Sequence, residues 1–170
     1  LLDMSSKKDD ALIAAFGEYI EYTMGRTLGT INGYLCHLNR LAKYLKNRGA
    51  SLQTASVDDL EIFAGLHLHE IGISPRSRRP AIAAIRGFYK WADRKGLIEG
   101  NPSTGLAYPQ IGRKLPNSMP LKAVESMLMQ TDLDTFMGVR DAAIIAVLAG
   151  CGLRVSGLVN LNEGDLMREI

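Results

Sequence analysis

Cysteine is scarce in this chain of 170 residues, and the two that it has lie far apart. Cys36 and Cys151 belong to no CxxC pair, so neither a disulfide framework nor a cysteine-based metal site is indicated. No apolar run approaches the roughly 18 residues that a membrane span needs. The first residues lack the apolar core of a secretory signal. We therefore expect a cytoplasmic protein with reduced thiols.

Several catalytic motifs are also missing. The sequence has no glycine-rich phosphate loop, no Ser/His/Asp set and no HExxH motif. Its histidines are His37, His67 and His69, and the last two point to different faces of an expected helix, which argues against metal binding by that pair. We expect no metal and no cofactor.

Positive charge is concentrated in the first hundred residues. Between Glu21 and Asp58 there is no acid but five basic residues, and residues 71–98 hold seven basic residues against one acid, Asp93. Residues 99–170 hold six basic and eight acidic groups. Two basic blocks favour a polyanionic partner. The alternative is that both blocks are ordinary solvated helix faces.

Apolar spacing predicts helices nearly throughout. Residues 10–24 form the first, and Gly25 ends it. Thr27 is expected to cap the second, which ends at Gly49. Its apolar stripe is the clearest in the chain: Ile31, Tyr34, Leu35, Leu38, Leu41, Ala42 and Leu45. Ser56 and Asp59 have the spacing of a capping box for a third helix that Gly72 closes.

The fourth helix is predicted to begin with Ser77 as N-cap, which places Pro80 at its third position, where a missing N–H costs nothing. Its buried stripe is Ile82, Ile85, Phe88, Tyr89 and Ala92. Four of the six prolines then fall in residues 101–120, which indicates a linker. Short helices follow at 121–130 and 155–160, with a strongly apolar one at 139–148. We predict a helical domain at 1–100, a linker at 101–120 and a second part at 121–170.

Two places offer chemistry. Arg79, Arg86 and Lys90 lie at i, i+7 and i+11, on one face of the fourth helix, where they could contact phosphates. Ser77 and Thr27 could donate hydroxyls to phosphates at two helix starts, although both are also plain N-cap candidates. Arg154 follows the apolar helix, and its planar guanidinium could hold a phosphodiester. The alternative is that Arg154 pairs with a carboxylate such as Asp141 or Asp165.

Four blocks in order resemble the tyrosine recombinase (phage integrase) family. They are TLGTINGYLCHLNRLAKYL, SPRSRRPAIAAIRGFYKWADRKGLIEGNP, LP before a short helix, and RDAAIIAVLAGCGLRVSGLVNLNEGDL. The resemblance implies a four-helix, SAM-like core-binding domain that binds duplex DNA, then a linker and the start of a mainly helical catalytic domain. The DNA-contacting residues that we expect are Thr27, Arg40, Lys43, Ser77, Arg78, Arg79, Arg86 and Lys90.

The resemblance also implies that Arg154 is the first catalytic arginine of the family. Gly157 stands where the family usually has an acid that helps to hold this arginine. No histidine follows His69, no lysine follows Lys122 and no tyrosine follows Tyr108, so the other catalytic residues of the family are missing. The parent would break and rejoin DNA strands as a tetramer of subunits, with an integration role on a mobile element, whereas these residues alone are predicted to be inactive. The alternatives are a shortened, non-catalytic regulator of recombination and an all-α protein-interaction module.

The apolar helix at 139–148 generates a first prediction. A second part of about 50 residues is too small to enclose it, so its cover must come from residues outside the chain, from the first domain or from another copy. We expect self-association or poor solubility, measured by sedimentation velocity. A soluble monomer with an intact second part would contradict this, unless the first domain covers the helix.

Overall fold

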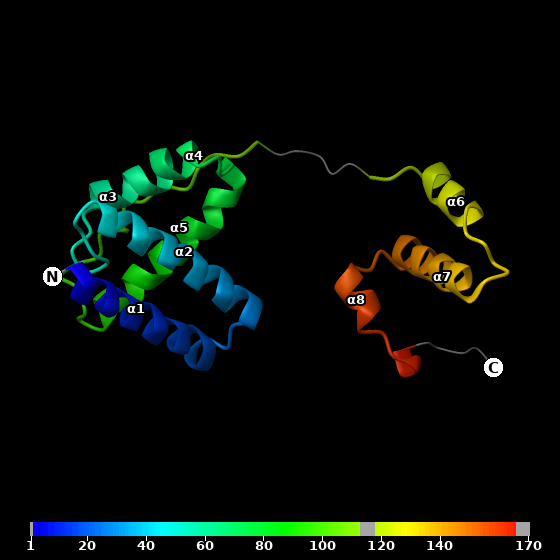
Figure 1. Cartoon of the computed structure of the whole chain (residues 1–170), viewed down its shortest axis with the longest axis horizontal. Coiled ribbons are helices and arrows are strands. Elements are labelled where there is room, and N and C mark those ends of the chain that lie inside the picture. The colour runs from blue at the N-terminus through cyan, green and yellow to red at the C-terminus, as the bar shows by residue number, and fades with distance from the viewer. Residues whose placement is uncertain (1, 113–117, 166–170) are drawn as a thin grey trace. The chain divides into compact units, whose positions relative to one another are not determined.

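The computed structural model describes residues 2–112 and 118–165, with side chains from Lys7 onward. The chain divides into two compact units, Leu1–Arg113 and Lys114–Ile170 (Figure 1). Residues 113–117 of the expected linker and 166–170 of the expected second part lie outside the described residues. The described residues contain helices and turns and no strand.

Unit 1 has the four helical stretches that the apolar spacing predicts. The first is α1 (Leu2–Glu18), which continues as a π-helical turn (Tyr19–Thr23). The second is α2 (Leu28–Asn47). The third combines α3 (Val57–Ile62), a π-helical turn (Phe63–His67) and α4 (Leu68–Glu70). The fourth is α5 (Pro75–Arg94). Helix α2 packs against both α1 and α5 (Figure 1).

The core of unit 1 contains the expected stripes. Leu38, Leu41 and Leu45 of α2 are fully buried, and so are Ile85, Phe88 and Tyr89 of α5. Aromatic rings join α1 to α5, because Phe16 meets Phe88 edge-on at 5.6 Å between ring centroids and Trp91 at 5.4 Å. Such ring pairs add to the free energy gained by burying their apolar area.

Helix ends follow the expected signals at most positions. Gly49 adopts a φ of 75°, which L side chains rarely reach, and the Ala50 N–H donates to the Leu45 carbonyl at 3.0 Å. This bond caps the carbonyls that α2 leaves open. Thr27 stands at the N-cap of α2, but its hydroxyl lies 3.2 Å from that of Thr30 and makes no bond to a backbone N–H.

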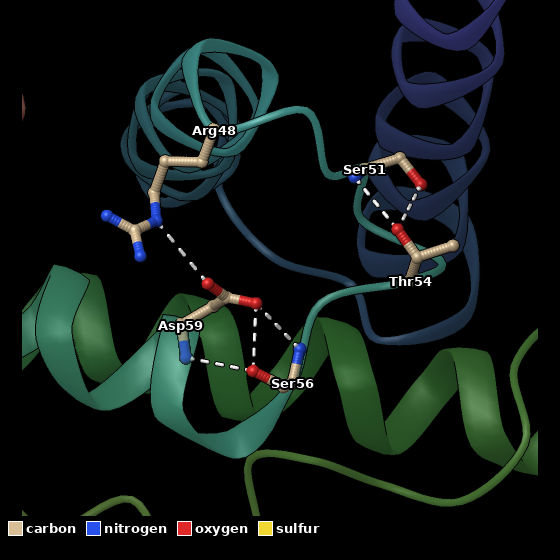
Figure 2. A network of polar contacts seen from close by, with 5 residues as sticks. All are labelled: Arg48, Ser51, Thr54, Ser56 and Asp59. Atoms are coloured by element: carbon tan, nitrogen blue, oxygen red, sulfur yellow. Dashed lines mark hydrogen bonds and ion pairs between the residues drawn. The ribbon is translucent and has the colours of Figure 1, made fainter.

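The expected capping box at α3 is present (Figure 2). The Asp59 N–H donates to the Ser56 hydroxyl at 3.1 Å, and the Ser56 N–H donates to the Asp59 carboxylate at 3.1 Å. Arg48, at the end of α2, places its Nε 3.5 Å from the other carboxylate oxygen. The bonds from Ser56, its backbone N–H first, lower the pKa of Asp59, and the charge of Arg48 adds to them.

The expected start of α5 is wrong. The N-cap is Ser74, whose hydroxyl accepts from the Ser77 N–H at 3.2 Å, and Pro75 takes the first helical position. Proline suits this position because its fixed φ is helical and its missing N–H would have no partner. Pro80 is therefore the sixth residue of α5. It has no N–H to donate to the Arg76 carbonyl, and Arg76 is an exposed residue.

The segment after α5, expected to belong to the linker, packs against unit 1. Asn101 accepts from both the N–H and the hydroxyl of Ser103, at 2.9 and 2.7 Å. Ser103 and Leu106 are buried, and Leu106 joins the core. Residues 101–108 are thus tied to unit 1 by a side-chain turn and an apolar anchor.

Unit 2 contains α6 (Leu121–Met129), α7 (Phe136–Cys151), α8 (Val155–Val159) and a 3-10 turn (Glu163–Asp165). Helix α7 begins earlier than its apolar run because the Thr135 hydroxyl caps it, accepting from the Gly138 N–H at 3.1 Å. A Cβ at Gly138 would overlap the Asp132 carbonyl, so glycine is required there. Gly150 lies inside α7, and Gly152, with a φ of 62°, ends the helix.

Apolar side chains at the start of α7 are exposed, whereas Ile144, Ile145, Val147 and Leu148, within the expected apolar run, are half-buried. Phe136 and Val139 have exposed fractions of 83% and 51%, and in α7 only Gly138 is buried. None of the helices in the described ranges is both long and apolar enough to cross a membrane.

A buried carboxyl joins α1 to the loop after α2. Asp9 has an exposed fraction of only 4%, and it accepts from the Leu52 N–H at 3.1 Å. The Leu52 carbonyl in turn accepts from the Tyr89 hydroxyl at 3.0 Å. Burial raises the pKa of Asp9, partly offset by the Leu52 bond, and burial also raises the pKa of Tyr89.

This network predicts how stability depends on pH. Because the folded pKa of Asp9 lies above its unfolded value of 3.8, the folded state binds more protons in that window, and the stability contributed by Asp9 falls as pH rises through it. Asp9→Asn keeps an acceptor without the charge, so it should be more stable than the wild type near pH 7 by a margin that shrinks toward about pH 4. Denaturant unfolding at several pH values measures this margin.

Asp9→Ala is the matched control for the hydrogen bond. It leaves the Leu52 N–H without a partner, so we expect a loss of about 1–3 kcal/mol in the free energy of unfolding near pH 4, and a smaller loss as pH rises and the wild type itself loses stability. Equal stability of all three proteins across the pH range would contradict the role assigned to Asp9.

Candidate nucleic-acid interface

The two sides of α5 differ in character. Its apolar side is buried from Ala81 to Ala92, and its outer side carries cations. Arg79, Lys90 and Arg94 are exposed, and Arg86 is half-buried. We call these four residues the α5 basic face. Because α5 is helical over these positions, Arg79, Arg86 and Lys90 share one face, as their spacing predicts.

Tyr108 joins two members of this face. The guanidinium carbon of Arg79 lies 5.2 Å from the centre of the Tyr108 ring, and that of Arg86 lies 5.5 Å from it. Arg86 also donates to the Leu106 carbonyl at 3.3 Å. Contacts of guanidinium groups with a ring are attractive because the ring face is electron-rich.

Two hollows adjoin along α5. The first is lined by Arg86, Lys90, Ser103, Thr104 and Tyr108, among others, and no acid lines it. The second has aromatic walls, and Gly87 and Lys90 line both. The aromatic and basic lining of the second comprises Phe16, Tyr19, Tyr34, Trp91, Arg26 and Arg94. The Arg94 guanidinium lies 5.2 Å from the centre of the Tyr19 ring.

The cations of the α5 basic face outnumber the acids of the helix, of which Asp93 is the only one. In the part of the chain that the structure describes, none of its four cations forms an ion pair with an acid, whereas Arg48 and Arg140 pair with Asp59 and Asp141. Cations gathered without counter-charges create a positive potential that attracts anions. The face can therefore receive phosphate groups.

Arg78 has different surroundings from its neighbour Arg79. Its Nε donates to the Ile73 carbonyl at 2.9 Å and one terminal nitrogen to the Gly65 carbonyl at 3.1 Å. The other terminal nitrogen lies 3.1 Å from the His69 ring. These contacts tie α5 to the third helical stretch.

Among the described residues, no hydrogen bond, ion pair or ring contact joins Thr27, Ser77, Arg40 or Lys43 to the α5 basic face. Thr27 is exposed beside Thr30, and the Ser77 hydroxyl accepts from that of Ser74 at 3.0 Å. Arg40 and Lys43 lie on α2, and within the described ranges no hydrogen bond, ion pair or ring contact joins them to this face. Burial, and after it the charge of Arg40, lower the pKa of His37.

Arg154 stands at the N-cap of α8 with an exposed side chain. Asp141 accepts from the neighbouring Arg140 at 2.9 and 2.6 Å, and Asp165 accepts from the Asn162 N–H at 2.9 Å. In the described part of unit 2, therefore, neither acid pairs with Arg154. Gly157 offers only its N–H, which donates to the Arg154 carbonyl at 2.8 Å.

The described residues contain no group of three His, Cys, Asp or Glu side chains placed to hold a metal ion. The residues that sequence reasoning missed are Tyr108, Arg94 and Arg26. Arg94 shares the outer side of α5, so helical spacing could have found it. No sequence pattern pointed to Tyr108, because the two arginines that its ring meets lie far from it in the sequence.

Comparisons with known proteins agree with this layout. The family model described as phage integrase, N-terminal SAM-like domain, matches residues 13–96. The chain is 30% identical over 155 residues to tyrosine recombinase XerC of Oceanobacillus iheyensis, covering 91% of the chain and 50% of the relative. It is 29% identical over 164 residues to XerD of Proteus mirabilis, covering 96% and 52%.

The chain belongs to the tyrosine recombinase family. XerC of Pseudomonas putida is 36% identical over 139 residues, which cover 81% of the chain and 46% of the relative. The chain thus spans about half the length of the curated relatives it matches. The expected fold is confirmed as mainly helical, with a SAM-like core-binding domain followed by the start of the catalytic domain.

Adjacent arginines give a direct test of the geometry. Arg78→Ala removes donors from the Ile73 and Gly65 carbonyls, so it should lower the free energy of unfolding by about 1–3 kcal/mol. Arg79→Ala, on the exposed side of the same helix, should change it by about 0.5 kcal/mol or less. Thermal and denaturant unfolding compare the two variants. Similar losses for both would show that Arg78 does not tie the helices together.

Proposed function

We propose that unit 1 binds duplex DNA, chiefly through the sugar-phosphate backbone, as the DNA-binding portion of a site-specific tyrosine recombinase. The observation that carries the proposal is the α5 basic face, in which Arg79 and Arg86 meet the Tyr108 ring, Arg86 also meets a carbonyl, and no cation forms an ion pair within the described residues. Contacts to phosphate position a protein on a duplex and release counterions.

Within this proposal the expected contact residues have different weights. Arg79, Arg86 and Lys90 are the central phosphate contacts. Thr27, Arg40, Lys43 and Ser77 are additional contacts that a long duplex would reach. Arg78 has a mainly structural part, since its nitrogens already contact two carbonyls and a histidine.

We also propose a role for Arg154 in unit 2. Its exposed guanidinium, without an acid partner in the described residues, suits a scissile phosphate that approaches from outside. It would act as one part of a catalytic set in the parent enzyme, together with other subunits on DNA. Gly157 carries no side chain to support this arginine. Because no tyrosine, histidine or lysine follows Arg154 to supply a nucleophile or a leaving-group acid, we expect no strand cleavage by these 170 residues alone. Three assignments along the chain stay predictions: 1–100 to DNA binding, 101–120 to a linker and 121–170 to the catalytic domain. A cytoplasmic location and an origin on a mobile element are also predictions.

A salt titration tests the proposal. The logarithm of the affinity for random-sequence duplex DNA should fall linearly with the logarithm of salt concentration, as measured by fluorescence anisotropy. Replacing Arg79, Arg86 and Lys90 with Ala should weaken binding to all sequences and reduce the slope by about 0.9 for each phosphate that is no longer neutralised.

The control removes the same charge elsewhere, by replacing Lys46, Lys122 and Arg140 with Ala. It should retain most of the slope, because none of these residues belongs to the α5 basic face. Affinity that is indifferent to salt, or equal weakening in both triple variants, would refute the proposal. Binding to acidic proteins without binding to DNA would instead favour an all-α interaction module.

A further inference from the structure

The segment that follows α5 turns back onto the α5 basic face. The turn at Asn101 and the burial of Ser103 and Leu106 attach it to unit 1. Tyr108 follows the Leu106 anchor by two residues, so its position is set by that anchor. Tyr108 as a residue keeps an exposed fraction of 39%, so it remains partly open to solvent while its ring meets the arginines.

The ring of Tyr108 restrains two long side chains at once. Arg79 and Arg86 lie two turns apart on α5, and both guanidinium groups lie within 5.5 Å of the same ring centre. A free arginine loses rotamer freedom when it binds. An arginine held against a ring has given up part of that freedom already, while its N–H groups remain available to an anion.

The hollow beside these arginines has the donors that a phosphate needs. Arg86 and Lys90 line it and supply both charge and N–H donors, whereas the Thr104 hydroxyl, also in its lining, has its proton engaged within the turn. The Thr104 hydroxyl donates to the Asn101 carbonyl at 2.9 Å, which fixes its place in the turn. Since no acid lines the hollow, nothing in its described lining repels an anion.

We propose that residues 101–108 form part of the DNA-contacting surface, where Tyr108 is a positioning residue that holds Arg79 and Arg86 for a backbone phosphate in the adjoining hollow. This inference rests on the proposed function and extends it beyond the helices to a segment that the sequence assigns to a linker. Tyr108 acts through the two arginines, and the hollow beside them receives the phosphate.

Three substitutions in the 170-residue chain separate the contributions of the ring. Tyr108→Phe keeps the ring and removes the hydroxyl, so its affinity for random-sequence duplex DNA should stay within about twofold of the wild type. Tyr108→Leu keeps apolar volume and removes the π face, so we expect about five- to tenfold weaker binding and a shallower salt slope. Tyr22→Ala, at an exposed tyrosine in the π-helical turn after α1, is the control and should bind like the wild type.

A double-mutant cycle distinguishes positioning from other roles. In a chain that already carries Arg79→Ala and Arg86→Ala, adding Tyr108→Leu should have no further effect on affinity. A merely structural role would give the same weakening in both backgrounds, together with a lower melting temperature. The melting temperature of Tyr108→Leu should stay near that of the wild type.

Each result bears on one claim. Salt-independent binding by the wild type would refute the proposed function itself. Salt-dependent binding that Tyr108→Leu leaves unchanged would overturn the role of Tyr108 and leave the proposed function standing. Weaker binding by Tyr108→Phe, or an equal effect of Tyr108→Leu in the background without the two arginines, would also overturn the positioning role.

Discussion

Burial of the apolar side of α5 is the constraint on which the interface depends. Phe88, Tyr89 and Ile85 are fully enclosed by the other helices of unit 1, so the helix cannot rotate about its axis without exposing them. With that side fixed inward, the residues half a turn away must face solvent. The positive face is therefore a consequence of apolar packing, and the cations themselves contribute little to holding the fold. This separation lets a surface carry unneutralised charge while the core supplies the stability.

The arginines of unit 1 show how the same side chain serves different ends. Arg48 meets the Asp59 carboxylate, and Arg78 meets backbone carbonyls, so both join elements of the fold. Arg79 and Arg86 meet the Tyr108 ring, which restrains a guanidinium without cancelling its charge. A ring is thus a partner that keeps arginine available to an anion, whereas a carboxylate is one that neutralises it.

Unit 2 has a different physical character. Its longest helix, α7, is apolar over most of its length, but its large apolar residues are only half-buried or exposed within the described residues. Arg154 stands at the start of the short helix that follows, where Gly157 provides backbone only. Such a unit needs further contacts to bury its apolar surface and to fix its arginine.

The sequence by itself determined the helices, the stops at Gly49 and Gly152, the capping box at Ser56 and the charged side of α5. Each depends on residues within a few positions of one another, so spacing alone predicts them. The first turn of α5 was decided by Pro75, which favours Ser74 over Ser77 as the cap. Only the tertiary structure decided that Arg78 is tied to carbonyls, that Arg79 pairs with no acid among the described residues, and that Tyr108 meets two arginines. Those contacts join segments many residues apart, and no local period encodes which distant ring or carbonyl a side chain will meet.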